Sequence, residues 1–209
     1  MGSPTPEPRS HTPWVKIGLW LVIATMGYNL IEAMIALWAG IKAQSIALVG
    51  FGLDSVIEMI AATVLLWRLY VEAKGTEAEE IEVAEHRVHR VVGITFIVLA
   101  AYVGIQSIWT LLSRSAPAES TLGIILAGVS LIIMPLVALG KLQAAKHIGS
   151  RALQAEAKET LACSYLSFCL LLGLSVNAIW GWWWADPVAA LFLIPFFIKE
   201  GLEAFSDDD

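Results

Sequence analysis

Residues 122–141 read LGIILAGVSLIIMPLVALGK, twenty residues whose single charge stands at the last position. A helix of about 20 residues spans the roughly 30 Å of hydrocarbon in a lipid bilayer. The run is about twice as long as a strand of a membrane β-barrel and lacks the alternation of polar and apolar residues of such strands. A helix is then the remaining way to cross, because lipid offers no partner for open backbone groups. This stretch therefore predicts a transmembrane helix.

Five further apolar stretches of similar length predict a bundle. The chain of 209 residues is 57% hydrophobic and 15% charged, whereas soluble domains are about 45–50% apolar and about 25% charged. The expected fold class is an all-α membrane protein, with six transmembrane helices in residues 14–205, a disordered tail in residues 1–13 and an acidic tail in residues 206–209. The six stretches are Trp14–Gly40, Ser45–Tyr70, Val91–Ser113, Leu122–Lys141, Ala152–Ile179 and Asp186–Phe205.

The distribution of Lys and Arg predicts the orientation, since cytoplasmic segments of membrane proteins carry an excess of these residues. If the N-terminus is inside, the outer segments hold only Lys42 and Arg114. We therefore expect both termini in the cytoplasm and a multi-pass protein of the bacterial cytoplasmic (inner) membrane. The net charge of −6 does not suit nucleic acid, which we exclude as a partner. The inner segments hold Arg9, Lys16, Arg68, Lys74, Arg87, Arg90, Lys141, Lys146, Arg151 and Lys199.

Ionisable side chains stand out within the apolar stretches, because a charge at the bilayer centre costs about 2.5–3.5 kcal/mol on insertion scales. Asp54 and Glu58 are four residues apart, so they share one helix face. Glu159 and Cys163 repeat this spacing in the fifth stretch. Asp54 and Cys163 each lie about ten residues, or roughly 15 Å, from an end of their helix. Both pairs therefore approach the midplane and can face each other.

Three carboxylates and a thiol suit a tetrahedral divalent transition metal, Zn²⁺ above all. The sequence predicts a metal site of Asp54, Glu58, Glu159 and Cys163. Zn²⁺ is favoured, Cd²⁺, Co²⁺, Fe²⁺ and Mn²⁺ are the other candidates, and no prosthetic group is expected. The alternative is that the acids are protonated and hydrogen-bonded within the bundle, and that Cys163 only packs in the core.

At these residues the sequence resembles the cation diffusion facilitator (cation efflux) family. Residues 45–58, SIALVGFGLDSVIE, are similar to that family's second transmembrane helix, in which Ser-x-Ala-Leu precedes a His-or-Asp-x-x-x-Asp pair. Residues 156–167, EAKETLACSYLS, are similar to its Asp-Ala-x-His-x-x-x-Asp-x-x-x-Ser motif, and residues 186–191, DPVAAL, resemble the start of its sixth helix. The resemblance covers all six helices in order and length.

The resemblance implies a homodimeric antiporter that exports divalent metal in exchange for protons by alternating access, with its metal site on the four residues named above. The sequence departs from the family in that Glu159 stands where His is usual, Cys163 where Asp is usual, and Phe51 where many members carry Asp. The His-rich loop between the fourth and fifth helices is reduced to His147. The chain also ends soon after the sixth stretch, so we expect a member without the cytoplasmic C-terminal domain.

Two other functions fit the same residues. A metal sensor or scaffold would bind metal without flux, and a proton-coupled transporter of another solute would use the acids as a proton relay. No soluble catalytic motif is present, so we do not expect an enzyme. In the polar segment between the second and third stretches, residues 71–90, His86 and His89 either bind metal at the cytoplasmic entrance or belong to a solvated surface. We expect this segment to extend the helices at the membrane surface.

Three acidic residues outside the four-residue set have separate predictions. Glu156 is expected to pair with Arg151 or Lys158. Glu32, three residues after Asn29, either lines an outer cavity or bonds one helix to another. Asp186 precedes a proline at the start of the sixth stretch, which predicts that it caps that helix.

Overall fold

The computed structural model describes the backbone of residues 12–73 and 78–206, and the side chains of residues 13–64, 66–67, 90–150 and 153–203. Within this part of the chain there are six helices and no strand, which confirms the all-α fold. The helices are α1 (Thr12–Ala43), α2 (Ile46–Ala73), α3 (Ala78–Ser113), α4 (Thr121–Ile148), α5 (Arg151–Trp180) and α6 (Ala185–Ser206).

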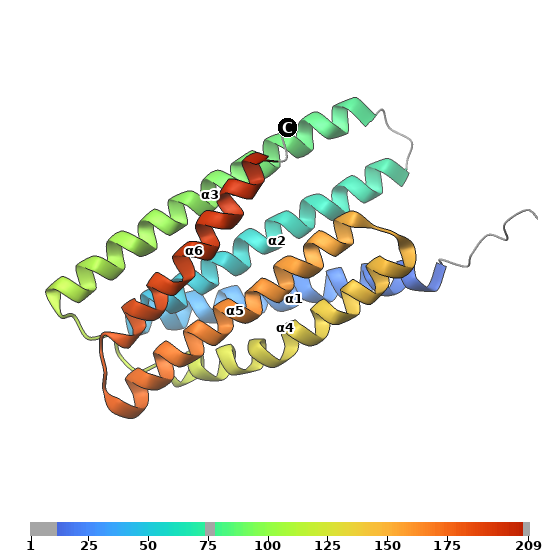
Figure 1. Ribbon diagram of the computed structural model, residues 1–209. Helices are drawn as coiled ribbons and strands as arrows, with labels where there is room; N and C mark the ends of the chain where they lie inside the picture. The colour runs from blue at the N-terminus through green and yellow to red at the C-terminus, as the bar shows by residue number, and fades with distance from the viewer. Residues whose placement is uncertain (1–11, 74–77, 207–209) are drawn as a thin grey trace, which may run out of the picture.

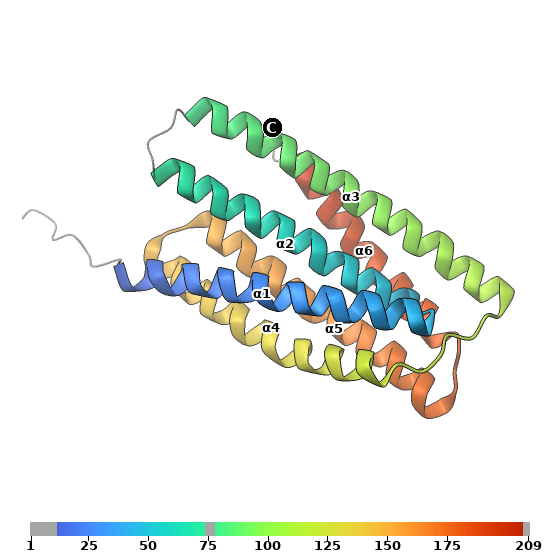
Figure 2. The ribbon, with the colours of Figure 1, turned by 180° about the vertical axis from the view of Figure 1, so that it is seen from behind.

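Five of the helices, α1 to α5, are long and apolar enough to cross a membrane. The sixth, α6, is not among them, because four charged residues fall within its 22 residues. It lies beside α3 in both ribbon views (Figures 1 and 2). The protein is thus a multi-pass membrane protein, and the sixth crossing stays a prediction. The charged residues of α6 are Asp186, Lys199, Glu200 and Glu203.

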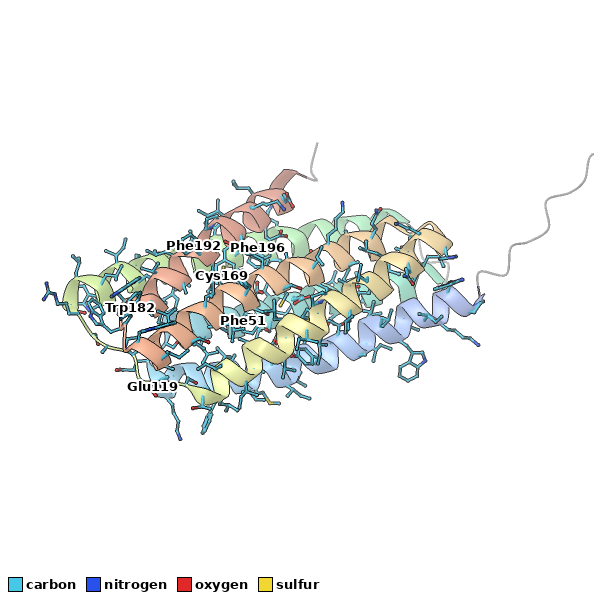
Figure 3. The ribbon with its side chains drawn as sticks, turned by 60° about the horizontal axis from the view of Figure 1, so that its bottom comes forward. Phe51, Glu119, Cys169, Trp182, Phe192 and Phe196 are labelled. Carbon is cyan, nitrogen blue, oxygen red and sulfur yellow. The ribbon has the colours of Figure 1, made fainter. Side chains whose placement is uncertain are left out.

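The helices run side by side, and α4 packs along α5, α1 along α2 and α4, and α3 along α6 (Figure 1). The start of α1 and the α4–α5 turn lie at one end, which we call the N-terminal end of the bundle (Figures 1 and 2). The α1–α2, α3–α4 and α5–α6 connections lie at the opposite end, where Figure 3 also shows Trp182 and Glu119. As a result, α2 and α5 run in opposite directions through the centre.

Helix α1 approaches α2 closely where α2 carries Gly52. A Cβ atom at Gly52 would lie 3.0 Å from the Ala36 Cβ and 3.0 Å from the Leu37 backbone nitrogen. Small residues permit such contacts between membrane helices, which associate through packing rather than through a hydrophobic driving force. This contact fixes α2 against α1 two residues before Asp54.

The carboxylate of Asp186 connects α6 to the start of α2. It accepts hydrogen bonds from the Ser45 hydroxyl and, at 2.9 Å, from the Ile46 backbone N–H. Since α6 begins at Ala185, Asp186 lies in the first helical turn, and the prediction that it caps its own helix was wrong. Instead it caps α2, where the unpaired N–H groups and the helix dipole favour a negative charge.

The remaining predictions for the ends and the polar segment are only partly within the described residues. Most of the two predicted tails, residues 1–13 and 206–209, lies outside the described residues. The described parts are helical, since α1 begins at Thr12 and α6 ends at Ser206. The polar segment is helical where it is described, since α2 continues to Ala73 and α3 begins at Ala78. The side chains of His86 and His89 lie outside the described residues.

Candidate metal site

Asp54, Glu58 and Cys163 come together in the interior of the bundle. One carboxylate oxygen of each acid and the Cys163 sulfur all lie within 4.8 Å of one another. The exposed fractions are 4% for Asp54, 9% for Glu58 and 1% for Cys163. We call these three residues the metal cluster.

The cluster follows from the periodicity of two antiparallel helices. Asp54 and Glu58 are one turn apart on α2, so both carboxylates leave the same face. The face of α5 that packs there carries Cys163, between the buried residues Thr160 and Leu166. The two carboxylates repel each other at this distance, and a bound dication would relieve that repulsion.

Glu159, the fourth predicted ligand, is not part of the cluster. It lines a small cavity of about 30 Å³ beside it, together with Asp54, Glu58 and Glu200 of α6. Because α5 runs away from the N-terminal end, Glu159 lies one turn closer to that end than Cys163. It therefore borders the approach to the cluster from that side, and Glu200 joins it there.

One oxygen of Glu58 has no hydrogen-bond partner among the residues that the structure describes. This atom, Oε2, is buried and accepts no hydrogen bond, whereas Oε1 accepts a 3.5 Å bond from the Thr160 hydroxyl. A buried carboxylate oxygen without a partner is unusual, and a bound ion or water is one of its ordinary explanations. Two carboxylates and a sulfur fit a borderline-soft dication such as Zn²⁺, with the cavity leaving room for a further ligand.

Glu32 of α1 lies in a separate polar network close to the cluster. It is 1% exposed and accepts hydrogen bonds from Ser55 of α2 at 2.8 Å and from Ser130 of α4. The Tyr28 hydroxyl lies 2.7 Å from the Ser130 hydroxyl. Of the two alternatives for Glu32, the bond between helices is confirmed. Serine and tyrosine residues of this network were not anticipated, because a single hydroxyl in an apolar helix carries little signal.

Glu156 pairs with Lys141 across the α4–α5 hairpin. The Lys141 ammonium lies 2.8 Å from Glu156 Oε1 and donates to the Thr160 hydroxyl at 2.9 Å. Of the two partners expected for Glu156, Lys158 is exposed and does not pair with it, and the side chain of Arg151 lies outside the described residues. Lys141 was also assigned to the polar inner segment, yet it is 0% exposed within α4.

The sequence of the turn between α4 and α5 could have predicted this ion pair. Gly149 ends α4 in the left-handed conformation, at φ 73°, and Ser150 caps α5. Glycine adopts this conformation without steric cost, so the chain reverses within two residues. Lys141 and Glu156 stand at nearly equal distances on either side of the turn, which brings them to the same level of two antiparallel helices.

Comparison with known proteins places this arrangement in a family. The profile described as the cation efflux transmembrane domain matches residues 21–208. The chain belongs to the cation efflux family. Its members are transporters rather than enzymes. All three residues of the metal cluster lie in the part that matches this cation efflux domain.

The curated relatives of this cation efflux protein include an uncharacterized transporter of Synechocystis sp. and Transmembrane protein 163 of Xenopus laevis. The first is 26% identical over 186 residues, which are 88% of this chain and 58% of the relative. The second is 25% identical over 170 residues, which are 81% of this chain and 59% of the relative. The chain thus spans a little under three fifths of the length of these relatives.

Proposed function

We propose that this protein transports a divalent transition-metal cation, Zn²⁺ in preference to others, across the membrane by alternating access in exchange for protons. The observation that carries the proposal is the metal cluster itself. Asp54, Glu58 and Cys163 come from two antiparallel membrane helices and meet in the interior, and one carboxylate oxygen has no partner among the described side chains. Intramembrane ionisable residues mark substrate and ion pathways in transporters.

The exchange for protons follows from the chemistry of the ligands. A carboxylate or a thiol binds a metal ion only after losing its proton, so metal binding releases protons and reprotonation favours metal release. If the cluster opens alternately to the two sides, these two reactions occur on opposite sides of the membrane. The proposal includes Glu159 as a fourth ligand, which would reach the metal from the adjoining cavity when the helices shift.

The orientation, direction and assembly belong to the same proposal. Both termini would lie in the cytoplasm of a bacterium, with transport outward and two copies forming a homodimer. The concentration of Lys and Arg in the predicted inner segments supports the orientation. The cyanobacterial relative agrees with a bacterial inner membrane.

The proposal predicts metal flux that depends on a proton gradient. Purified protein in proteoliposomes should transport Zn²⁺ or Cd²⁺ in one direction and protons in the other. One dye reports the metal and a second dye reports the internal pH. Collapsing the pH gradient with an ionophore should slow the flux at least several-fold. Co²⁺, Fe²⁺ and Mn²⁺ are tested in the same vesicles to rank the metals.

Each rival function gives a different result in these vesicles. Metal binding with no flux under any gradient would indicate a sensor or scaffold. Proton movement that no metal stimulates would indicate a transporter of another solute. Metal flux with an unchanged rate and yield after the gradient is collapsed would contradict proton exchange while leaving metal transport in place.

A further inference from the structure

Lys141 is the only buried lysine or arginine among the side chains that the structure describes. Its exposed fraction is 0%, and it lies between the metal cluster and the N-terminal end of the bundle, since its partners Glu156 and Thr160 precede Cys163 on α5. A charged side chain within a membrane bundle is costly and marks a functional residue by default. Nothing in the proposed exchange of metal for protons uses this charge.

The ammonium of Lys141 is one hydroxyl group away from the cluster. It donates to Thr160 Oγ1 at 2.9 Å, and Thr160 Oγ1 lies 3.5 Å from Glu58 Oε1. Thr160 therefore links the positive end of the ion pair, and not the Glu156 carboxylate, to the carboxylate of Glu58.

Stability alone is a poor explanation for this pair. Replacing a buried ion pair by neutral residues of similar volume is often neutral or stabilising, because burying both charges costs about as much as their attraction returns. Within the described part of the chain the pair is also incompletely bonded, since Glu156 Oε2 is buried and no described residue donates a hydrogen bond to it. An ion pair whose only role was to hold α4 against α5 would not need to place a charge so close to the cluster.

We propose that Lys141 sets the metal affinity of the cluster, as a fixed positive charge that weakens dication binding and so speeds metal release. The ammonium attracts the ionised Glu58 carboxylate when the cluster is empty, and it repels a dication that enters. The acidic groups around Glu58 act in the opposite sense, and these are Asp54, Glu159 and Glu200 at the same cavity, Glu32 of α1, and Glu156 of the pair. This inference rests on the proposed function, in that it assumes a metal ion at the cluster.

The test replaces both charges together, so that neither is left buried and unpaired. The full chain with Lys141→Gln and Glu156→Gln is compared with the wild type by Zn²⁺ titration in lipid nanodiscs and by Zn²⁺ flux in proteoliposomes. We expect the Kd for Zn²⁺ to fall at least threefold and the maximal flux to fall as well, because release from the tighter site is slower. Thermal unfolding checks that the double variant is folded.

Three further variants complete the design. Lys146→Gln removes the same charge from an exposed position on the same helix and should leave both Kd and flux unchanged. Lys141→Arg keeps the charge and should leave the Kd within twofold of the wild type. If the glutamine pair does not fold, the apolar pair Lys141→Met with Glu156→Leu takes its place, with the same expected fall in Kd.

The possible outcomes separate this inference from the proposed function. A folded neutral pair whose Kd and flux equal those of the wild type would show that the ion pair is structural, and a weaker Kd would reverse the proposed sign. Either result would overturn the proposed role of Lys141. If Asp54→Asn abolishes metal binding in the same assays, the proposed function is unaffected by that result. A wild-type protein that binds no Zn²⁺, Cd²⁺, Co²⁺, Fe²⁺ or Mn²⁺ would overturn the proposed function itself.

Discussion

Asp54→Asn and Glu58→Gln should each reduce metal flux in proteoliposomes by about 100-fold or more. Each substitution removes one of the two carboxylates that face the Cys163 sulfur in the metal cluster. Loss of a partner that only orients a metal ligand costs about 10–100-fold in affinity or activity, so loss of a ligand should cost at least as much. Neither change should impair folding, because an amide avoids the cost of a charge in the bilayer.

The control for this prediction is Glu203→Gln, which makes the same change at a position on α6 that is 59% exposed. Its flux should equal that of the wild type, and all three variants should show wild-type expression and size-exclusion profiles. Near-normal flux in a well-folded Asp54→Asn or Glu58→Gln variant would remove the cluster from the transport pathway.

Substitution of Cys163 should change which metal the protein carries. A thiolate is a softer ligand than a carboxylate and favours Zn²⁺ and Cd²⁺ over Mn²⁺. Cys163→Asp should therefore shift the preference toward Mn²⁺ by about tenfold or more, and Cys163→Ser should weaken Cd²⁺ binding more than Mn²⁺ binding. Competition binding with purified protein measures both ratios.

The thiol should also leave a signature in the pH dependence. A free thiol has a pKa of about 8.5 and a free carboxyl group one of about 4, and each must lose its proton before it binds metal. Zn²⁺ affinity of the wild type should therefore keep rising with pH above the range in which carboxylates ionise. This alkaline rise should be absent in Cys163→Asp.

Cys169→Ser provides the matched control, since Cys169 is also buried on α5 but lies outside the metal cluster. It should keep the wild-type metal ranking and pH profile. If Cys163→Ala and Cys163→Asp also keep them, Cys163 only packs in the core and the ligands would be carboxylates alone.

The helices, and the candidate ligands Asp54, Glu58 and Cys163 that meet in the cluster, were accessible from sequence because both depend on local periodicity. Each apolar run marks the part of a helix that can lie in lipid, so the number and order of helices followed directly. The same runs do not mark helix ends, and α3 begins at Ala78 rather than Val91 because it continues through polar residues. The four-residue spacing placed Asp54 and Glu58 on one face for the same local reason.

Contacts between helices required the tertiary structure. Spacing alone put Glu159 with Cys163, but the packing of α5 against α2 directs only Cys163 into the cluster and leaves Glu159 at the adjoining cavity. Counting positive charges assigned Lys141 to the polar inner segment, although its partner on α5 buries it. Asp186 likewise bonds to α2 rather than to its own helix, which no local pattern indicates.

X-ray absorption spectroscopy of the Zn²⁺-loaded protein tests the central claim most directly, because it reports the atoms bound to the metal. We predict one sulfur at about 2.3 Å together with oxygen ligands at about 2.0–2.2 Å in the wild type, and loss of the sulfur contribution in Cys163→Ser. A shell of light atoms alone in the wild type, unchanged in Cys163→Ser and in Asp54→Asn, would contradict a metal site at Asp54, Glu58 and Cys163.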